Sequence, residues 1–283
     1  MHLKQLLTFL CLSFALFAGD RGWISVELAD MYRCHSEPQY KWAHTFFDSF
    51  SFDDSINLLD FGCGDGKITA ELANKFQSGH VVGVDCSPCM IEVAKREFPH
   101  HLHQNLTFIT TPAETLGLYD VITAFSVFHF VDKPVELLKN LRSHLKNNGK
   151  LFLLIPLPPN TIMRNAANDC FPKYGLSPPW HLPNYSSHLS MRTTAGAMQK
   201  LEEADFQILS FNEVASPMIF PNKEDFVLWL MGTASANWGI PLEIAQPFFN
   251  ELVDKMLELD PTLSSSDGSV HYPQALLQII AGL

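Results

Sequence analysis

A glycine-rich stretch after a short apolar run constrains the fold more than any other part of the chain. Leu58, Leu59 and Phe61 have the apolar character of a buried parallel strand. Glycines follow at positions 62, 64 and 66, and a helical pattern begins directly after them. Glycines permit a tight turn and let a ligand approach bare backbone, while the first amides of the helix point at that ligand. The stretch predicts a strand, a turn and a helix, and either a ligand site or a purely structural turn.

The first apolar run contains an acid, Asp60, and a second apolar run, residues 81–84, is followed by the acid Asp85. A carboxylate at the end of the second strand of a doubly wound sheet can accept hydrogen bonds from both hydroxyls of a ribose. The glycine spacing fits the nicotinamide fingerprint G-x-G-x-x-G poorly. These features favour a nucleotide cofactor of another kind.

The sequences Leu59-Asp60-Phe61-Gly62-Cys63-Gly64-Asp65-Gly66 and Val84-Asp85-Cys86-Ser87-Pro88-Cys89-Met90-Ile91 resemble the class I S-adenosylmethionine-dependent methyltransferases. The resemblance implies S-adenosylmethionine as cofactor. Relatives often carry an acid for the adenine amino group after the third strand, where this chain has Pro112. The cofactor-binding residues that the resemblance implies are Asp60, Gly62, Cys63, Gly64, Asp85, Cys86, Met90, Ala113, Glu114 and Ser126.

The end of the chain narrows the resemblance. This part of the chain is similar to the trans-aconitate and juvenile hormone acid methyltransferase group. The similarity lies in Trp229-x-x-Gly232-Thr233, in a second helical segment and in Tyr272-Pro273 before a last strand. The implied fold is an α/β, Rossmann-like, doubly wound sheet of seven mainly parallel strands. Its last strand is expected to be antiparallel and inserted at one edge, with a helical and loop cap from residues 30–50, 156–192 and 222–262.

The same resemblance places the substrate beside the N-terminal segment and the end of the fourth strand. Relatives read Leu-His-Trp-Val where this chain has Phe128-His129-Phe130-Val131, so Phe130 replaces a substrate-facing tryptophan. His129 is a base, a substrate hydrogen-bond donor or a structural residue. Residues 156–192 are rich in proline and aromatics, which indicates either a pocket wall or a loop covering the core. The implied substrate residues are Tyr32, Gln39, Trp42, His129, Phe130 and Trp180.

Composition restricts the partners. The formal charge of −11 and a pI near 5.5 disfavour binding to a nucleic-acid backbone. Cys86-x-x-Cys89 lacks the second pair of ligands that a zinc site needs, and reduced cysteines without a metal are expected. We expect a monomer acting on a small molecule.

Residues 1–26 look like a leader or a non-catalytic extension, and the methyltransferase domain is expected over residues 27–283. Lys4 precedes an apolar run over residues 6–18, which is short for a transmembrane helix. Membrane contact is expected only through residues 1–18, if they are retained. A cytoplasmic location is expected, with a secreted or membrane-associated protein as the alternative if the leader is genuine.

The resemblance predicts transfer of a methyl group to a carboxylic acid, which gives a methyl ester. A carboxylate is ionised at pH 7 and needs no base. Two alternatives stay open: methylation of a hydroxylated small molecule with His129 as the base, and a catalytically inactive protein that only binds the cofactor.

Overall fold

The computed structural model describes residues 25–47, 52–111, 117–158, 161–181 and 190–283. Its elements, in chain order, are α2 (Val26–His35), α3 (Glu37–Phe47), β1 (Asn57–Phe61), α4 (Lys67–Lys75), β2 (His80–Asp85), α5 (Pro88–Glu97), β3 (Leu106–Thr110), β4 (Tyr119–Phe125), η1 (Phe128–Phe130), α6 (Pro134–Ser143), β5 (Leu145–Pro156), α7 (Thr161–Cys170), η2 (Phe171–Tyr174), η3 (Pro179–His181), α9 (Thr194–Glu203), β6 (Gln207–Ala215), β7 (Met218–Phe220), α10 (Lys223–Trp238), α11 (Leu242–Leu259), η4 (Pro261–Leu263), β8 (Val270–Tyr272) and β9 (Ala275–Gly282).

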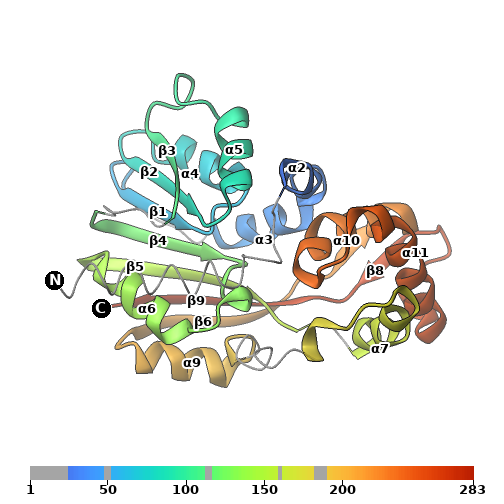
Figure 1. Ribbon diagram of the computed structural model, residues 1–283. Helices are drawn as coiled ribbons and strands as arrows, with labels where there is room; N and C mark the ends of the chain where they lie inside the picture. The colour runs from blue at the N-terminus through green and yellow to red at the C-terminus, as the bar shows by residue number, and fades with distance from the viewer. Residues whose placement is uncertain (1–24, 48–51, 112–116, 159–160, 182–189) are drawn as a thin grey trace.

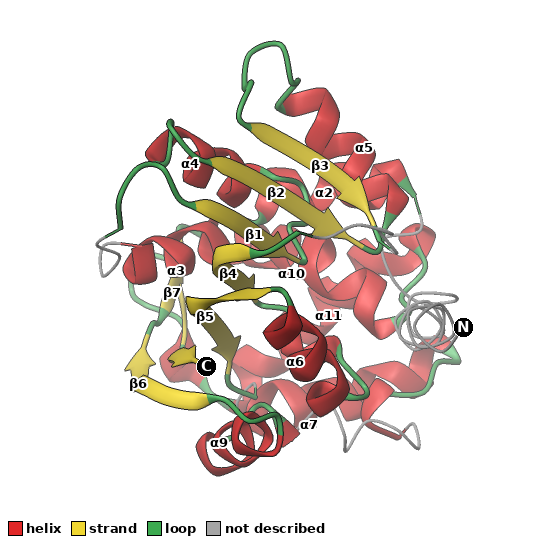
Figure 2. Cartoon of the chain, turned by 90° about the vertical axis from the view of Figure 1, so that its left-hand side faces the viewer, coloured by secondary structure: helices red, strands yellow, loops and turns green. Residues whose placement is uncertain are grey.

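The described strands form a seven-stranded sheet in the order β3-β2-β1-β4-β5-β9-β6 (Figure 1). Figure 2 shows β3, β2, β1, β4 and β5 following one another across the sheet. The strands β1 to β5 pair in parallel, and β9 runs antiparallel to both β5 and β6. The predicted fold class is confirmed. The last strand lies between β5 and the edge strand β6, so it is one position inside the edge.

Side-chain alternation along the strands builds a core on each face of the sheet. Leu58 belongs to the core that contains residues of α3, α4, α7, α10 and α11. Its neighbour Leu59 belongs to the core on the other face, with residues of α6 and α9. Figure 1 shows α7, α10 and α11 together on the right of the sheet, with α2 above α10.

Several elements differ from the sequence-based expectations. Residues 26–35 form the helix α2, which was not predicted. Asn147-Asn148-Gly149 is a sequence typical of a turn or a helix end, yet α6 ends at Ser143 and these residues lie within β5. Residues 156–192 include the helix α7, whose buried residues Met163, Ala166, Ala167 and Cys170 follow a helical period. The strands β7 and β8 form a second, two-stranded sheet that was also not predicted.

No helix in the described ranges has the length and apolar character needed to cross a bilayer. The leader-like segment lies outside the described residues except for Ser25 and Val26. The proposed domain boundaries at residues 26 and 27 stay a prediction.

Candidate functional site

The glycine turn begins where β1 ends, at the centre of the sheet. Its amides at Gly62 and Cys63 both donate to the Val84 carbonyl of β2, at 2.8 and 3.0 Å. Gly62, Gly64 and Gly66 have φ angles of 75°, 54° and 77°. L-residues with a side chain rarely adopt this left-handed region, so the turn depends on glycine. Gly66 is also the residue before the first turn of α4.

Asp85 ends β2 and faces the glycine turn. Its Oδ2 accepts a hydrogen bond from the Gly64 amide at 3.0 Å, and its Oδ1 accepts one from the Ser87 amide at 2.8 Å. Burial raises the pKa of the Asp85 carboxyl. The carboxylate therefore connects the glycine turn to the start of α5. This structural role is separate from any binding of a ligand.

Asp60 is the buried acid of β1, with 3% of its surface exposed. It accepts hydrogen bonds from the hydroxyls of Thr69 at 2.6 Å and Thr123 at 2.7 Å. Burial raises its pKa to about 6, while the two hydroxyls act in the opposite direction. The protein therefore holds a carboxylate whose charge changes near neutral pH.

This shift predicts a pH dependence of stability. A carboxyl with a raised folded-state pKa stabilises the fold fully below its ordinary pKa of 3.8, and this contribution is lost as the pH rises through about 6. Between pH 5 and pH 7 the loss amounts to about 1 kcal/mol. Thermal or denaturant unfolding of the wild type and of Asp60→Asn at both pH values measures it, because asparagine cannot titrate. Equal pH dependence in the two proteins would contradict the assignment.

A small cavity lies over the turn, and its walls come from α2, α3, β1, the turn, α4 and the end of β4. The residues that line it are Tyr32, Gln39, Asp60, Gly62, Cys63, Gly64, Asp65, Ile68, Phe125 and Ser126. Its free volume is about 30 Å³, which is close to that of one water molecule. A nucleoside is larger than this volume, so a bound cofactor would extend beyond the cavity or displace part of its wall.

The helix α2 contributes Tyr32 to the wall. A Cβ atom on Gly64 would lie 3.9 Å from Cε1 of Tyr32, so the Tyr32 ring lies over the turn. Burial raises the pKa of the Tyr32 phenol, and the charges of Asp65, Asp85 and Asp60 add to the shift. The side chain is therefore a neutral, largely apolar cover.

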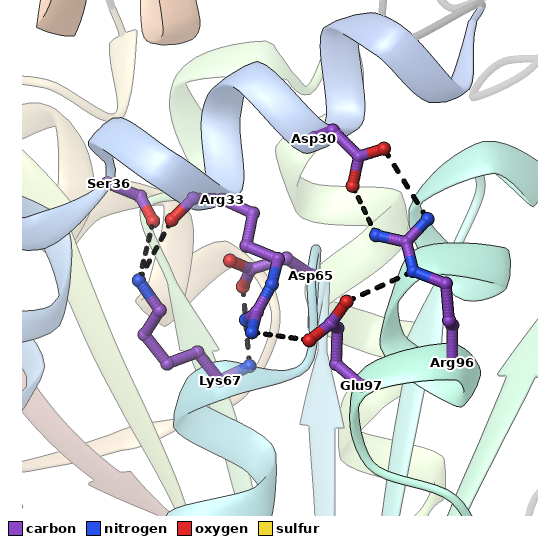
Figure 3. A network of polar contacts seen from close by, with 7 residues as sticks. All are labelled: Asp30, Arg33, Ser36, Asp65, Lys67, Arg96 and Glu97. Atoms are coloured by element: carbon purple, nitrogen blue, oxygen red, sulfur yellow. Dashed lines mark hydrogen bonds and ion pairs between the residues drawn. The ribbon is translucent and has the colours of Figure 1, made fainter.

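Polar contacts hold α2 against α4 and α5 (Figure 3). Arg33 Nη2 bonds Glu97 Oε2 at 2.6 Å, and Arg96 pairs with Asp30. Lys67 Nζ donates to the Arg33 carbonyl at 3.1 Å and to Ser36 Oγ at 3.3 Å. These ion pairs are partly exposed, so each contributes little on its own, and together they fix α2 beside the turn.

Asp65 is a site residue that the sequence analysis did not select. Its Oδ1 accepts a hydrogen bond from the Lys67 amide at 3.3 Å. Its Oδ2 is buried and has no hydrogen-bond partner among the described residues. Its position between Gly64 and Gly66 was the available signal, because this turn was expected to lie at a ligand site.

The structure brings together seven of the predicted residues around the cavity and leaves others apart from it. The seven are Tyr32, Gln39, Asp60, Gly62, Cys63, Gly64 and Ser126. Asp85 is joined to them through Gly64, and Cys86 follows it in the chain. The predicted residues that do not line the cavity are Cys86, Met90, Trp42, His129, Phe130 and Trp180; Ala113 and Glu114 lie outside the described residues.

These residues have other surroundings. Met90 is buried beside Ala29 under α2, and Trp42 is buried in the core below α3. His129 and Phe130 lie on η1, directly after β4, with ring centroids 3.7 Å apart. The Trp180 indole donates to Asn168 Oδ1 at 2.8 Å, on α7. Their predicted contacts with substrate stay predictions.

The Cys86-x-x-Cys89 pair and the histidines at 100, 101 and 103 belong to no group of three or more potential metal ligands; the described residues contain no such group. The cysteines described at positions 34, 63, 86, 89 and 170 are all free thiols. Burial raises the pKa of the Cys63 thiol inside the turn, which makes it an apolar wall rather than a nucleophile.

Comparison with known proteins identifies the fold around this turn. A family model described as a methyltransferase domain matches residues 59–151, from β1 into β5. The chain contains a class I S-adenosylmethionine-dependent methyltransferase domain. The predicted family and its cofactor, S-adenosylmethionine, are confirmed at this level.

Curated relatives match part of the chain. A malonyl-[acyl-carrier protein] O-methyltransferase of Halalkalibacterium halodurans is 38% identical over 116 residues, which are 38% of this chain and 42% of that protein. A trans-aconitate 2-methyltransferase of an Enterobacter species is 30% identical over 154 residues, 52% of this chain and 58% of that protein. The chain thus spans about half the length of these relatives.

Solved structures match the methyltransferase fold over most of the chain. The YcgJ protein of Bacillus subtilis has a TM-score of 0.55 at 16% identity, covering 86% of this chain and 97% of that one. A methyltransferase of Thiobacillus denitrificans, in complex with S-adenosylhomocysteine, has a TM-score of 0.52 at 13% identity, covering 85% and 90%. At these identities the likeness establishes the fold.

The residues of the glycine turn and its neighbours fit the cofactor. Glycine backbone at three positions leaves room for a close approach, and the Asp85 carboxylate beside the turn can accept hydrogen bonds from ribose hydroxyls. The buried Asp65 Oδ2 is a free acceptor for a donor on the ligand. S-adenosylmethionine carries ammonium and sulfonium charges, which the three neighbouring acids favour.

Proposed function

We propose that the protein transfers the methyl group of S-adenosylmethionine to the carboxylate of a small, apolar carboxylic acid and produces its methyl ester. The cofactor, when bound, supplies an electrophilic methyl group on a cationic sulfur, and a carboxylate oxygen that takes this methyl group leaves S-adenosylhomocysteine and an ester. The observation that carries the proposal is a neutral amide, that of Gln39, in the wall of the methyltransferase cavity.

A neutral amide suits a carboxylate in these surroundings. Asp60 and Asp65 line the same cavity, and Asp85 is adjacent through Gly64. Their negative charges repel a carboxylate, so a donor without charge is the partner that can hold it while leaving the acids to the cationic cofactor. The names of the two relatives, which refer to a malonyl group and to trans-aconitate, support a carboxylate as the methyl acceptor.

The fixed cations argue for one carboxylate on the substrate rather than several. None of the described residues that line the cavity is lysine, arginine or histidine. In the segment 156–192, Lys173 pairs with Glu251, Arg164 lies over the Trp180 ring, and Arg192 donates to two backbone carbonyls. A tricarboxylate would lack partners for its further charges.

The protein's own groups then position the acid and exclude water from the site. Gln39 orients the acid, and Tyr32 with Ile68 and Phe125 covers the site with apolar surface. No proton has to be removed, because a carboxylate is already ionised at pH 7. This agrees with a cavity whose described lining contains no histidine.

A panel of methyl acceptors tests the function. The purified protein and S-adenosylmethionine are incubated with aliphatic and aromatic monocarboxylic acids, tricarboxylic acids, catechols and amines, and products are identified by mass spectrometry. We expect methyl esters of apolar monocarboxylic acids. Products only from catechols would favour the hydroxylated-substrate alternative, and cofactor binding by calorimetry without any product would favour the inactive binding protein.

Gln39→Ala tests the recognition of the acid. We expect the KM for the acid to rise about tenfold or more, because a hydrogen bond to a charged group contributes about 1.5–3 kcal/mol. The affinity for S-adenosylmethionine should change little. Gln199→Ala, on the exposed surface of α9, is the matched control. Equal losses of acid and cofactor binding would show that Gln39 contacts the cofactor instead.

A further inference from the structure

A hydrogen bond joins the cavity wall to a helix almost two hundred residues away in the chain. The indole Nε1 of Trp229, on α10, donates to Oε1 of Gln39, on α3, at 3.2 Å. Among the residues that the structure describes, this is the hydrogen bond that the Gln39 side chain makes. Gln39 lines the methyltransferase cavity, whereas Trp229 lies behind it.

The indole fixes which end of the amide faces the cavity. An indole N–H can only donate, so its partner must be the carbonyl oxygen of Gln39 and not the amino group. The two ends of a glutamine amide point in different directions from the same carbon. With Oε1 turned to Trp229, the Nε2 amino group is left for a ligand in the cavity, and it presents two donors.

The indole itself is held in one place. Trp229 is 9% exposed, and its ring packs against Phe220, Phe226 and Tyr272, with centroids 5.6, 5.9 and 6.4 Å away. An aromatic ring with neighbours on several sides cannot turn its N–H elsewhere without disturbing the core. A buried N–H also needs an acceptor, so the bond to Gln39 satisfies both partners.

We propose that Trp229 is a positioning residue that makes the cavity wall selective for a carboxylate, by holding the Gln39 amide with its amino group toward the substrate. This inference rests on the proposed function. Without the indole N–H, the amide can turn over and present its carbonyl oxygen, which repels a carboxylate. Two residues far apart in the sequence then act as one recognition unit.

Trp229→Phe tests this because phenylalanine keeps an aromatic ring among the same neighbours and removes the N–H donor together with part of the ring volume, and the control variant shows the effect of the lost volume. We expect the KM for the acid to rise about fivefold to tenfold, with kcat and the affinity for S-adenosylmethionine nearly unchanged. Trp238→Phe is the matched control: it makes the same change on the same helix, where the ring packs against Phe171 and Phe249, away from the cavity. Thermal unfolding verifies that both variants fold.

The double variant Gln39→Ala/Trp229→Phe separates positioning from packing. If Trp229 acts through Gln39, the double variant should bind the acid no more weakly than the single variant Gln39→Ala. If the two losses multiply, or if Trp229→Phe and Trp238→Phe raise the KM equally, the positioning role is overturned.

Exchange of the Trp229 indole proton, followed by NMR, gives a readout independent of activity. We expect at least tenfold faster exchange in Gln39→Ala than in the wild type, because the bond is lost. Unchanged exchange would refute the bond itself. If the wild type methylates no acid, the proposed function and the carboxylate selectivity fail together, while the exchange of the indole proton still decides the orientation of the amide. If acids are methylated and Trp229→Phe leaves the KM for the acid unchanged, only the inference fails.

Discussion

Replacing Asp85 with asparagine is expected to weaken S-adenosylmethionine binding at least tenfold. We expect both oxygens of this carboxylate to hold the ribose hydroxyls, and hydrogen bonds to a charged group contribute about 1.5–3 kcal/mol each. Asparagine keeps one oxygen and loses the charge, so one such contribution or more is lost, at 1.4 kcal/mol for each factor of ten. Calorimetry with S-adenosylmethionine measures the change.

The fold should largely survive this substitution. Asparagine can still accept one of the two backbone hydrogen bonds, from Gly64 or Ser87, and removal of a buried charge offsets part of the loss. Asp120→Asn is the control, because Asp120 also accepts from a backbone amide, that of Asn57 at 2.9 Å, at the start of β4 and thus at the opposite ends of the strands. Unchanged cofactor affinity in Asp85→Asn would reduce Asp85 to a structural connection between the turn and α5.

Among the substitutions considered, Gly62→Ala should cause the largest loss of stability, about 2–5 kcal/mol. The φ angle of 75° costs a residue with a Cβ about 1–2 kcal/mol. In addition, a Cβ at this position would lie 2.3 Å from Cγ2 of Val127, and such overpacking costs about 1–3 kcal/mol. Denaturant unfolding measures the sum.

Gly175→Ala separates the two causes. Gly175 has a similar φ of 69°, yet a Cβ at this position would have no neighbouring atom within 4 Å, so only the backbone strain applies. We expect it to lose about 1–2 kcal/mol. Adding Val127→Ala to Gly62→Ala should restore part of the stability by relieving the contact. Equal losses in Gly62→Ala and Gly175→Ala would show that Val127 yields and that the turn depends on backbone conformation alone.

Local sequence was enough to predict the cofactor half of the domain. Apolar runs that end in Asp60 and Asp85 read as buried strands, and their acids stand at strand ends because the chain order and the parallel pairing place them there. The glycine turn was also readable, since a left-handed backbone at three nearby positions requires residues without a Cβ. These features depend on neighbours in the chain.

Residues around the same turn also show what local reading missed. Asp65 lies in the same turn as the predicted residues, and its place in the cavity wall and its buried Oδ2 without a hydrogen-bond partner among the described residues mark it as a site residue. Trp180 was expected at the substrate because it lies in an aromatic segment. The fold places its ring against Phe171 and Trp238, and its contact with substrate stays a prediction.

The sequence by itself determined the strands, the glycine turn and the acids at the strand ends, because burial, alternation and φ preferences act over a few residues. Only the tertiary structure decided which distant segments complete the site. The helix α2 packs on α10 at Gly232, where a Cβ would lie 3.0 Å from the Met31 carbonyl, and Trp229 of the same helix α10 meets Gln39 on α3. Such pairings depend on the shape of two surfaces that meet only after folding, and no local period in either segment specifies them.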